Sequence, residues 1–355
     1  TGTGIWHHKG GLMVMKTKRS VLSILRGNVP WVVLIVLMVA FNIMSPNFIS
    51  YRNIYNILIQ NAYLLIAAFG VTLIMMAGEM DLSVGYQISL VGILTAKALN
   101  AGLPVVLCIL MACAIAVAIC VLNCLLAKSL GLPLMLISLG TMTICQGLSY
   151  VISGAYSFFG FPDSFRFLGQ GYIGGVISVP VLIALICFVV LSVMLNRTYF
   201  GRYIYAIGSN SEAASLAGIN VFRTMLLIAV IEGLCVGLST VLVIGKLGSA
   251  QSAVGVGTEF VVLTAVILGG VSIRGGEGKL SGSLAGILIL AVLSNGMQLA
   301  KMGTYVQYIA KGAIMLLAVS FDVYNLRSRS KAPKIRGKET PETAAPAGPK
   351  NTEET

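Results

Sequence analysis

Histidine is almost absent from this sequence. Its two histidines, His7 and His8, are neighbours near the N-terminus. The body of the chain therefore has no imidazole for general-base catalysis or for a zinc site. Charge is also scarce: Asp, Glu, Lys and Arg make up 10% of the residues, against about 25% in soluble domains. A soluble globule of this size could not cover its surface with so few charges, and a disordered chain needs more of them.

Apolar residues fill the space that charge leaves. They make up 57% of the 355 residues, and the mean hydropathy is +0.92. A helix needs about 20 apolar residues to cross a membrane. The sequence predicts an all-α, polytopic membrane protein with about ten transmembrane helices. The predicted spans are 30–45, 54–77, 84–99, 103–127, 133–153, 176–196, 222–245, 259–270, 280–300 and 304–322. The eighth is too short to cross alone unless it tilts or pairs with a re-entrant segment.

The positions of the basic residues predict the orientation. With ten crossings and a cytoplasmic N-terminus, most Lys and Arg residues fall on the cytoplasmic side, and the C-terminus is cytoplasmic too. We interpret residues 1–29 as a remnant followed by a basic cytoplasmic segment, 30–326 as the membrane domain, and 327–355 as a disordered cytoplasmic tail. Anionic inner-leaflet lipid then accounts for the net charge of +12, and a nucleic-acid partner is disfavoured.

The seven cysteines all lie in apolar runs. We expect them to pack as small apolar side chains, since a thiol metal site would need polar surroundings and supporting hydrogen bonds. The segment Gly275–Leu280 superficially resembles a phosphate-binding loop, but it lacks the Ser or Thr after the Lys and the preceding strand. The sequence therefore predicts no catalytic residue, no metal and no cofactor site, and a membrane-embedded enzyme is disfavoured.

The longest predicted cytoplasmic loop is 197–223. Asn210 and Ser211 offer helix-capping side chains, and Glu212 falls in the first turn. A short helix of small residues is expected to follow and to end at Gly218. On the residues alone, this helix suits docking in a partner's groove but also fits an ordinary connector.

Two other segments, Gly70–Gly92 and Gly257–Gly286, each join an apolar helix to a small-residue helix through a glycine-rich turn. The predicted topology places both turns on the cytoplasmic side, which hints at an internal duplication. Glu79 and Asp81 lie at a break in the first of these segments, with Gly78 and Gly85 on either side, and the alternative interpretation is a tight turn with solvated carboxylates.

Polar residues within the spans are candidates for a translocation path, because they are costly in lipid and usually face the bundle interior. Glu232 lies mid-span, either on the path or as a structural carboxyl that is protonated or paired, with Lys311 as a possible partner. The predicted path residues are Gln60, Asn61, Thr72, Glu232, Asn295 and Gln298.

Five segments, in order, resemble the permease subunits of bacterial ATP-binding-cassette importers of the ribose, xylose and galactose type. They are AGEMDLSVG, LPLMLISLGTM, FGRYIYAIGSNSEAASLAGINV, TAVILGGVSIRGGEGKLSGSLAG and YVQYIAKGAIMLLAVSFD. The resemblance implies a ten-helix permease of the bacterial inner membrane that translocates a small sugar. It also implies a second permease copy or paralogue, a periplasmic sugar-binding protein, and a partner ATPase that uses the ATP.

The family's Glu-Ala-Ala…Gly signature falls on Glu212, Ala213, Ala214 and Gly218, and the resemblance turns the 197–223 loop into the expected ATPase-docking site. Its predicted coupling residues are Ser211, Glu212, Ala213, Ala214, Leu216, Ala217 and Gly218. The chain departs from the family at Glu232, where a small or hydroxyl residue is usual. The competing hypothesis is a secondary transporter whose ion-coupling residues are Asp81, Glu232, Glu259 and Lys311.

Overall fold

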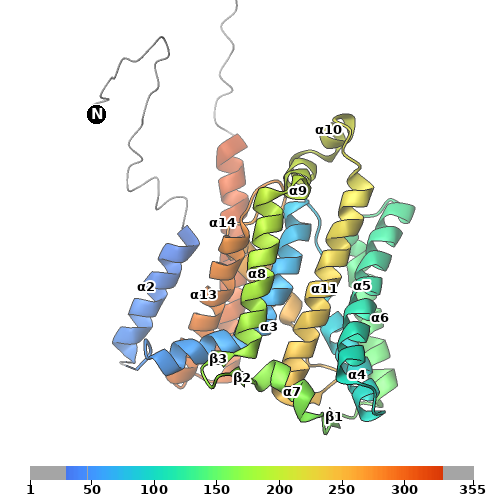
Figure 1. Ribbon diagram of the computed structural model, residues 1–355. Coiled ribbons are helices and arrows are strands. Elements are labelled where there is room, and N and C mark those ends of the chain that lie inside the picture. Colours follow the sequence, from blue (N-terminus) through green and yellow to red (C-terminus); the bar gives the residue numbers. More distant parts are fainter. Residues whose placement is uncertain (1–28, 46, 331–355) are drawn as a thin grey trace, which may run out of the picture.

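The computed structural model describes residues 29–45 and 47–330, and it shows a bundle of helices (Figure 1). The predicted N-terminal segment before Val29 and the predicted tail beyond Ser330 lie outside the described residues. The last helix, α14 (Thr304–Ser330), continues past the predicted boundary at residue 326.

Within the described residues, six helices are long and apolar enough to cross a membrane. They are α3 (Tyr51–Met76), α5 (Val105–Leu130), α6 (Leu134–Ser153), α8 (Val179–Arg197), α11 (Val221–Leu247) and α13 (Leu280–Leu299). Shorter apolar helices are α2 (Val29–Met44), α12 (Thr258–Leu268) and the stretch Tyr305–Leu317 of α14. With α4 (Val84–Asn100), every predicted span contains a helix. The chain is thus a polytopic, mostly helical protein, whereas the count of ten crossings and the cytoplasmic termini remain predictions.

The helices form an inner and an outer layer. The apolar windows of α3, α11 and α13 are 67%, 72% and 67% buried, while those of α5, α6 and α8 are 22%, 17% and 28% buried. The outer helices expose Leu, Ile and Val side chains along their length. Lipid or another apolar chain must cover this surface in the cell, since water would leave it exposed at a large cost.

The two ends of the bundle carry different short elements (Figure 1). One end holds α7 (Asp163–Gln170) and two antiparallel pairs of short strands. Strand β1 (Phe158–Phe159) pairs with β4 (Ser249–Ala250), and β2 (Tyr172–Ile173) pairs with β3 (Ile177–Ser178). The opposite end holds α9 (Tyr199–Ser209) and α10 (Ser211–Leu216), and there α2 begins and α14 ends.

Two helices begin inside the bundle rather than at its surface. The chain leaves α3, runs without helical structure through residues 77–83, and starts α4 among buried residues. The loop after β4 likewise leads to α12, whose 11 residues span about 16 Å at 1.5 Å per residue. The two starts touch, because a Cβ atom on Gly85 would overlap the Gly255 carbonyl oxygen. Such non-helical backbone is tolerated at membrane depth only where protein or a water path covers it.

Candidate functional site

The short helix predicted in the 197–223 loop is α10. Asn210 caps it, accepting a 2.9 Å hydrogen bond from the Ala213 backbone N–H. Gly218 ends it in the left-handed region, at φ +86°. Apart from Ala214 the helix is exposed, and Leu216 at its end is 91% exposed. The structure thus places the seven predicted coupling residues on one protruding element, while their docking role stays a prediction.

A junction of glycines connects this loop to the membrane helices. Gly208, near the end of α9, lies so close to the end of α3 that a Cβ atom there would overlap the carbonyl oxygen of Met76. The same Met76 oxygen accepts a 2.8 Å hydrogen bond from the N–H of Gly276, in the turn between α12 and α13. A Cβ atom on Gly275 would meet the backbone of Gly78. The two glycine-rich turns predicted from the sequence therefore meet, and the end of α9 packs against both of them.

The carboxylates of the first turn are not simply solvated, so that interpretation is wrong for Asp81, which is buried. Glu79 is half-buried and accepts a 3.1 Å hydrogen bond from the N–H of Leu134, at the start of α6. Burial raises the pKa of Glu79, and the hydrogen bond from Leu134 offsets part of this rise. Both acids connect the break before α4 to neighbouring helices.

Asp81 is the centre of a buried polar group, here called the Asp81 cluster. One carboxylate oxygen accepts a 2.6 Å hydrogen bond from the backbone N–H of Ser83 and a second from its hydroxyl, at the start of α4. The other oxygen lies 3.5 Å from the amide nitrogen of Asn123 on α5. The cluster comprises Asp81, Ser83, Gln87, Cys120, Asn123 and Glu232.

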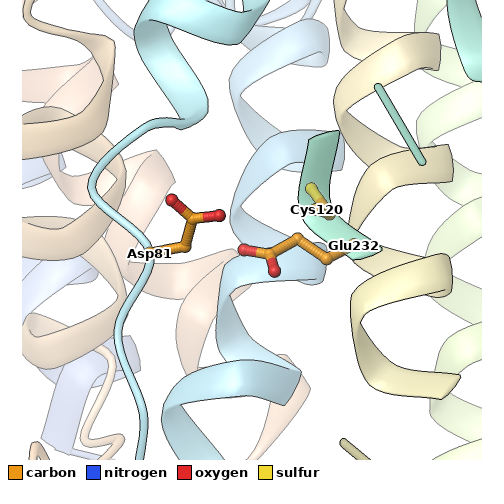
Figure 2. Close-up of side chains that lie close together, drawn as sticks. All are labelled: Asp81, Cys120 and Glu232. Carbon is orange, nitrogen blue, oxygen red and sulfur yellow. The ribbon is translucent and has the colours of Figure 1, made fainter. Parts of the chain in front are cut away.

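Glu232 enters this cluster from near the middle of α11, and its carboxyl group points toward Asp81, with the Cys120 side chain nearby (Figure 2). It is fully buried, and neither of its oxygens has a hydrogen-bond partner among the described residues. The pairing of Glu232 with Lys311 is therefore wrong. The reason is topological, since α14 packs against α12 and α13.

The other predicted path residues fall in different surroundings. Thr72 is buried, and its hydroxyl lies 2.7 Å from that of Ser283 on α13. The side chain of Asn295 accepts a 2.9 Å hydrogen bond from that of Asn53. Gln60, Asn61 and Gln298 are exposed or half-buried. The six residues thus do not share one environment.

A pocket of about 630 Å³ lies at the end of the bundle opposite α10, where α3 begins. Three tyrosines contribute to its wall, two of which, Tyr51 and Tyr55, stack with ring centroids 5.6 Å apart. Its other lining residues are Asn47, Ser50, Arg52, Asn53, Asn56, Ile59, Tyr172 and Leu299. Aromatic faces beside amide groups suit a polar organic solute.

Sequence reasoning missed the partners of Asp81. Asn123 and Gln87 are polar residues inside apolar helices, a pattern that marks buried hydrogen-bonded sites. The sequence therefore indicates that these side chains are buried. It does not indicate that α4, α5 and α11, which are far apart in the sequence, converge at Asp81. The glycine junction carried no such signal, because many other glycines of the chain serve helix packing.

Comparison with known proteins gives a consistent assignment. The profile of the family described as "branched-chain amino acid transport system / permease component" matches residues 53–319. The ribose import permease protein of Bacillus subtilis is 36% identical over 295 residues, which is 82% of this chain and 91% of the relative. The galactose/methyl galactoside import permease protein of Escherichia coli is 34% identical over 323 residues, covering 86% and 96%. The L-arabinose transport system permease protein of Escherichia coli is 33% identical over 298 residues, covering 84% and 90%.

No solved structure matches the chain. The family match covers most of the described helices, including both broken segments, α9 and α10. The alternative of an ion-coupled secondary transporter is not favoured. The chain therefore belongs to the permease family of ATP-binding-cassette monosaccharide importers, as its sequence motifs predicted.

Proposed function

We propose that this permease carries a small sugar across the bacterial inner membrane, working as a pair with a second copy or a paralogue. A periplasmic binding protein delivers the sugar, and a cytoplasmic ATPase docks on the 197–223 loop and hydrolyses the ATP. The names of the relatives support a sugar as the substrate, since they import ribose, galactose and arabinose. The exposed apolar outer helices support insertion in lipid and pairing with another permease.

The observation that carries this proposal is the contact between α9 and both glycine-rich turns. A pull on α10 is transmitted to α9, since the two helices are separated only by Asn210. Through Gly208, α9 bears directly on the backbone of Met76, just before the break that leads to α4, and on that of Gly276, in the turn that follows α12. Motion of the docked ATPase would thus reach the bundle interior without a long chain of flexible side chains.

The sugar path itself needs only weak contacts, because a conducted solute must leave as easily as it enters. The pocket beside Tyr51 and Tyr55 suits entry from the binding protein, since it lies at the end of the bundle away from α10. The starts of α4 and α12, which lie inside the bundle, suit the inner part of the sugar route, because discontinuous helices commonly line the binding sites of transporters.

A photo-crosslinking amino acid in place of Leu216 tests the docking step. We expect ATP-sensitive crosslinks from this position to the ATPase in inverted membrane vesicles. The matched control is the same substitution at Tyr156, which is 79% exposed and adjoins β1 at the other end of the bundle. Crosslinks from Tyr156 but not from Leu216 would reverse the proposed orientation.

Uptake in proteoliposomes tests the transport step. The purified permease, ATPase and binding protein should accumulate labelled ribose, galactose or arabinose only with ATP. Accumulation by the permease alone, driven by an ion gradient, would contradict the proposal.

A further inference from the structure

Three potential metal ligands converge in the Asp81 cluster from separate parts of the chain. Asp81 comes from the break before α4, Cys120 from α5 and Glu232 from α11 (Figure 2). Their ligand atoms all lie within 4.8 Å of one another, and all three residues are buried. The apolar run around Cys120 predicts that it packs as a small apolar side chain, yet its thiol lies 3.4 Å from the side-chain oxygen of Gln87.

Glu232 is the feature that apolar packing does not explain. A fully buried carboxyl group whose two oxygens lack hydrogen bonds is costly, because burial removes its hydration without replacing it. Its ionisable neighbour Asp81 is another carboxyl group, and repulsion between two like charges adds to the cost of ionising Glu232. A cation between the two groups would remove both costs at once.

We propose that Asp81, Cys120 and Glu232 bind a divalent transition-metal cation of the Zn²⁺ class within the membrane domain. A bound Cys120 is a thiolate, so together with two carboxylates the ligands carry three negative charges. A divalent ion cancels two of them and a proton kept on one carboxyl group cancels the third, which matters where water does not screen charge. The sulfur ligand favours Zn²⁺ over Mg²⁺ or Ca²⁺, which prefer oxygen ligands alone. The small size of the ion also fits a place where the helices pack closely. Gly70 on α3 approaches α11 so closely that a Cβ atom on Gly70 would lie 3.1 Å from the Cα atom of Glu232.

The surroundings support the ligands in the way that metal sites require. Ser83 and Asn123 hold the Asp81 carboxylate, and the Asn123 side-chain oxygen accepts a 2.6 Å hydrogen bond from Thr141 on α6. Ligand atoms around a tetrahedral Zn²⁺ ion lie about 3.4–3.8 Å apart. The ligand atoms of Asp81, Cys120 and Glu232 lie within 4.8 Å of one another, so they must approach somewhat to bind the ion. Rotation of the Glu232 side chain can close this gap, because its oxygens have no hydrogen bond to break. The ion would join the break before α4 to α5 and α11.

Metal titration of the purified full-length permease tests this proposal. His7 and His8 are replaced by Ala beforehand, and no histidine tag is used, so that imidazole cannot bind the ion. After treatment with a chelator, we expect Zn²⁺ to bind with one ion per chain by calorimetry and by elemental analysis. We also expect Co²⁺ to give a sulfur-to-metal charge-transfer absorption band.

Matched variants locate the site. Glu232→Gln and Cys120→Ser should each weaken Zn²⁺ binding at least about tenfold, since even changes behind the ligands cost about 10–100-fold. Cys120→Ser should also abolish the Co²⁺ band. The controls are Cys124→Ser, one turn away on α5 and also buried, and Glu259→Gln, a buried carboxyl on α12. Both should bind as the parent does.

Two results would overturn the proposal. One is a parent protein that takes up no Zn²⁺ or Co²⁺, which would leave a proton as the only cation between the carboxyl groups. The other is binding that persists unchanged in Glu232→Gln and Cys120→Ser. Because both substitutions keep side-chain size, they are expected to fold, and a melting curve of each variant without metal verifies this.

Discussion

The hydroxyl group of Tyr205 on α9 donates a 3.0 Å hydrogen bond to the carbonyl oxygen of Gly278, in the turn between α12 and α13. This bond joins residues 73 positions apart in the sequence. It lies next to the junction of Gly208 with Gly276 and adds a side-chain connection to backbone contacts. The loop that carries α10 is thereby fixed to the second broken segment of the bundle.

Replacing Tyr205 with Phe should loosen this connection without filling or emptying space. We expect a loss of about 0.5–1.5 kcal/mol in stability, the usual net contribution of one hydrogen bond. Sugar uptake per ATP hydrolysed should fall, because α9 would move without carrying the turn with it. Parallel measurements of uptake and ATPase activity in proteoliposomes check this, and equal losses in both would indicate a different cause.

The same bond should weaken at alkaline pH. Burial raises the pKa of Tyr205, so the folded protein holds the hydroxyl proton more tightly than the unfolded chain does. The stabilisation is therefore complete below the unfolded value of about 10 and is lost as the pH rises through the higher folded value. The melting temperature of the parent should approach that of Tyr205→Phe over this range.

Adding one methyl group at Gly208 should separate α9 from the ends of the broken segments. A Cβ atom there would overlap the Met76 oxygen, and backbone atoms cannot rotate away as a side chain can. We expect Gly208→Ala to cost about 1–3 kcal/mol, as overpacking usually does, and to reduce uptake strongly. The control is Gly147→Ala on α6, where no atom lies within 4 Å of the added carbon. Loss of uptake in the control alone would contradict the role of the junction.

Local signals in the sequence are sufficient to predict the helices and the short helix α10 in the 197–223 loop. A helix lies in each predicted apolar run, and the Asn210 cap and Gly218 end of α10 follow from residue type within a few positions. The start of α12 is harder to predict, because its short length is compatible with either a tilted helix or a re-entrant neighbour. These features depend on the nearest residues, which a sequence displays directly.

Contacts between distant helices could not be predicted in the same way. Nothing near Glu232 in sequence indicates that Asp81 and Cys120 will face it, because its position on α11 allows several neighbours. The pairing with Lys311 follows from opposite charge and a similar depth in the spans, and it is wrong because α14 packs against α12 and α13. The meeting of Gly208 with Gly276 similarly depends on how two loops pack.

Changes in α10 should separate docking from folding. Gly218 has a left-handed backbone, so Gly218→Val should cost about 1–2 kcal/mol locally and should displace the end of the helix. Glu212→Arg reverses an exposed charge in the first turn. We expect both variants to insert normally but to lose copurification with the ATPase, and with it uptake.

Gly174→Val is the matched control for backbone strain, because Gly174 also has a positive φ, +61°, and lies in the β2–β3 turn, at the end away from α10. It should still copurify with the ATPase. Loss of copurification in Gly174→Val, or normal uptake by Gly218→Val and Glu212→Arg together, would show that α10 is an ordinary connector.

Thr72 distinguishes a path residue from a packing residue. Its hydroxyl lies 2.6 Å from the Ala68 carbonyl oxygen and 2.7 Å from the Ser283 hydroxyl, so its hydrogen-bonding capacity is already used between α3 and α13. Thr72→Val keeps the shape but leaves Ser283 unpaired, which should cost about 1–3 kcal/mol in stability. Ser283→Ala should cost a similar amount, and the double variant should cost less than the sum, because each change removes the same interaction. Uptake KM should stay constant across the three variants, whereas a KM that rises with Thr72→Val but not with Ser283→Ala would place Thr72 on the sugar path after all.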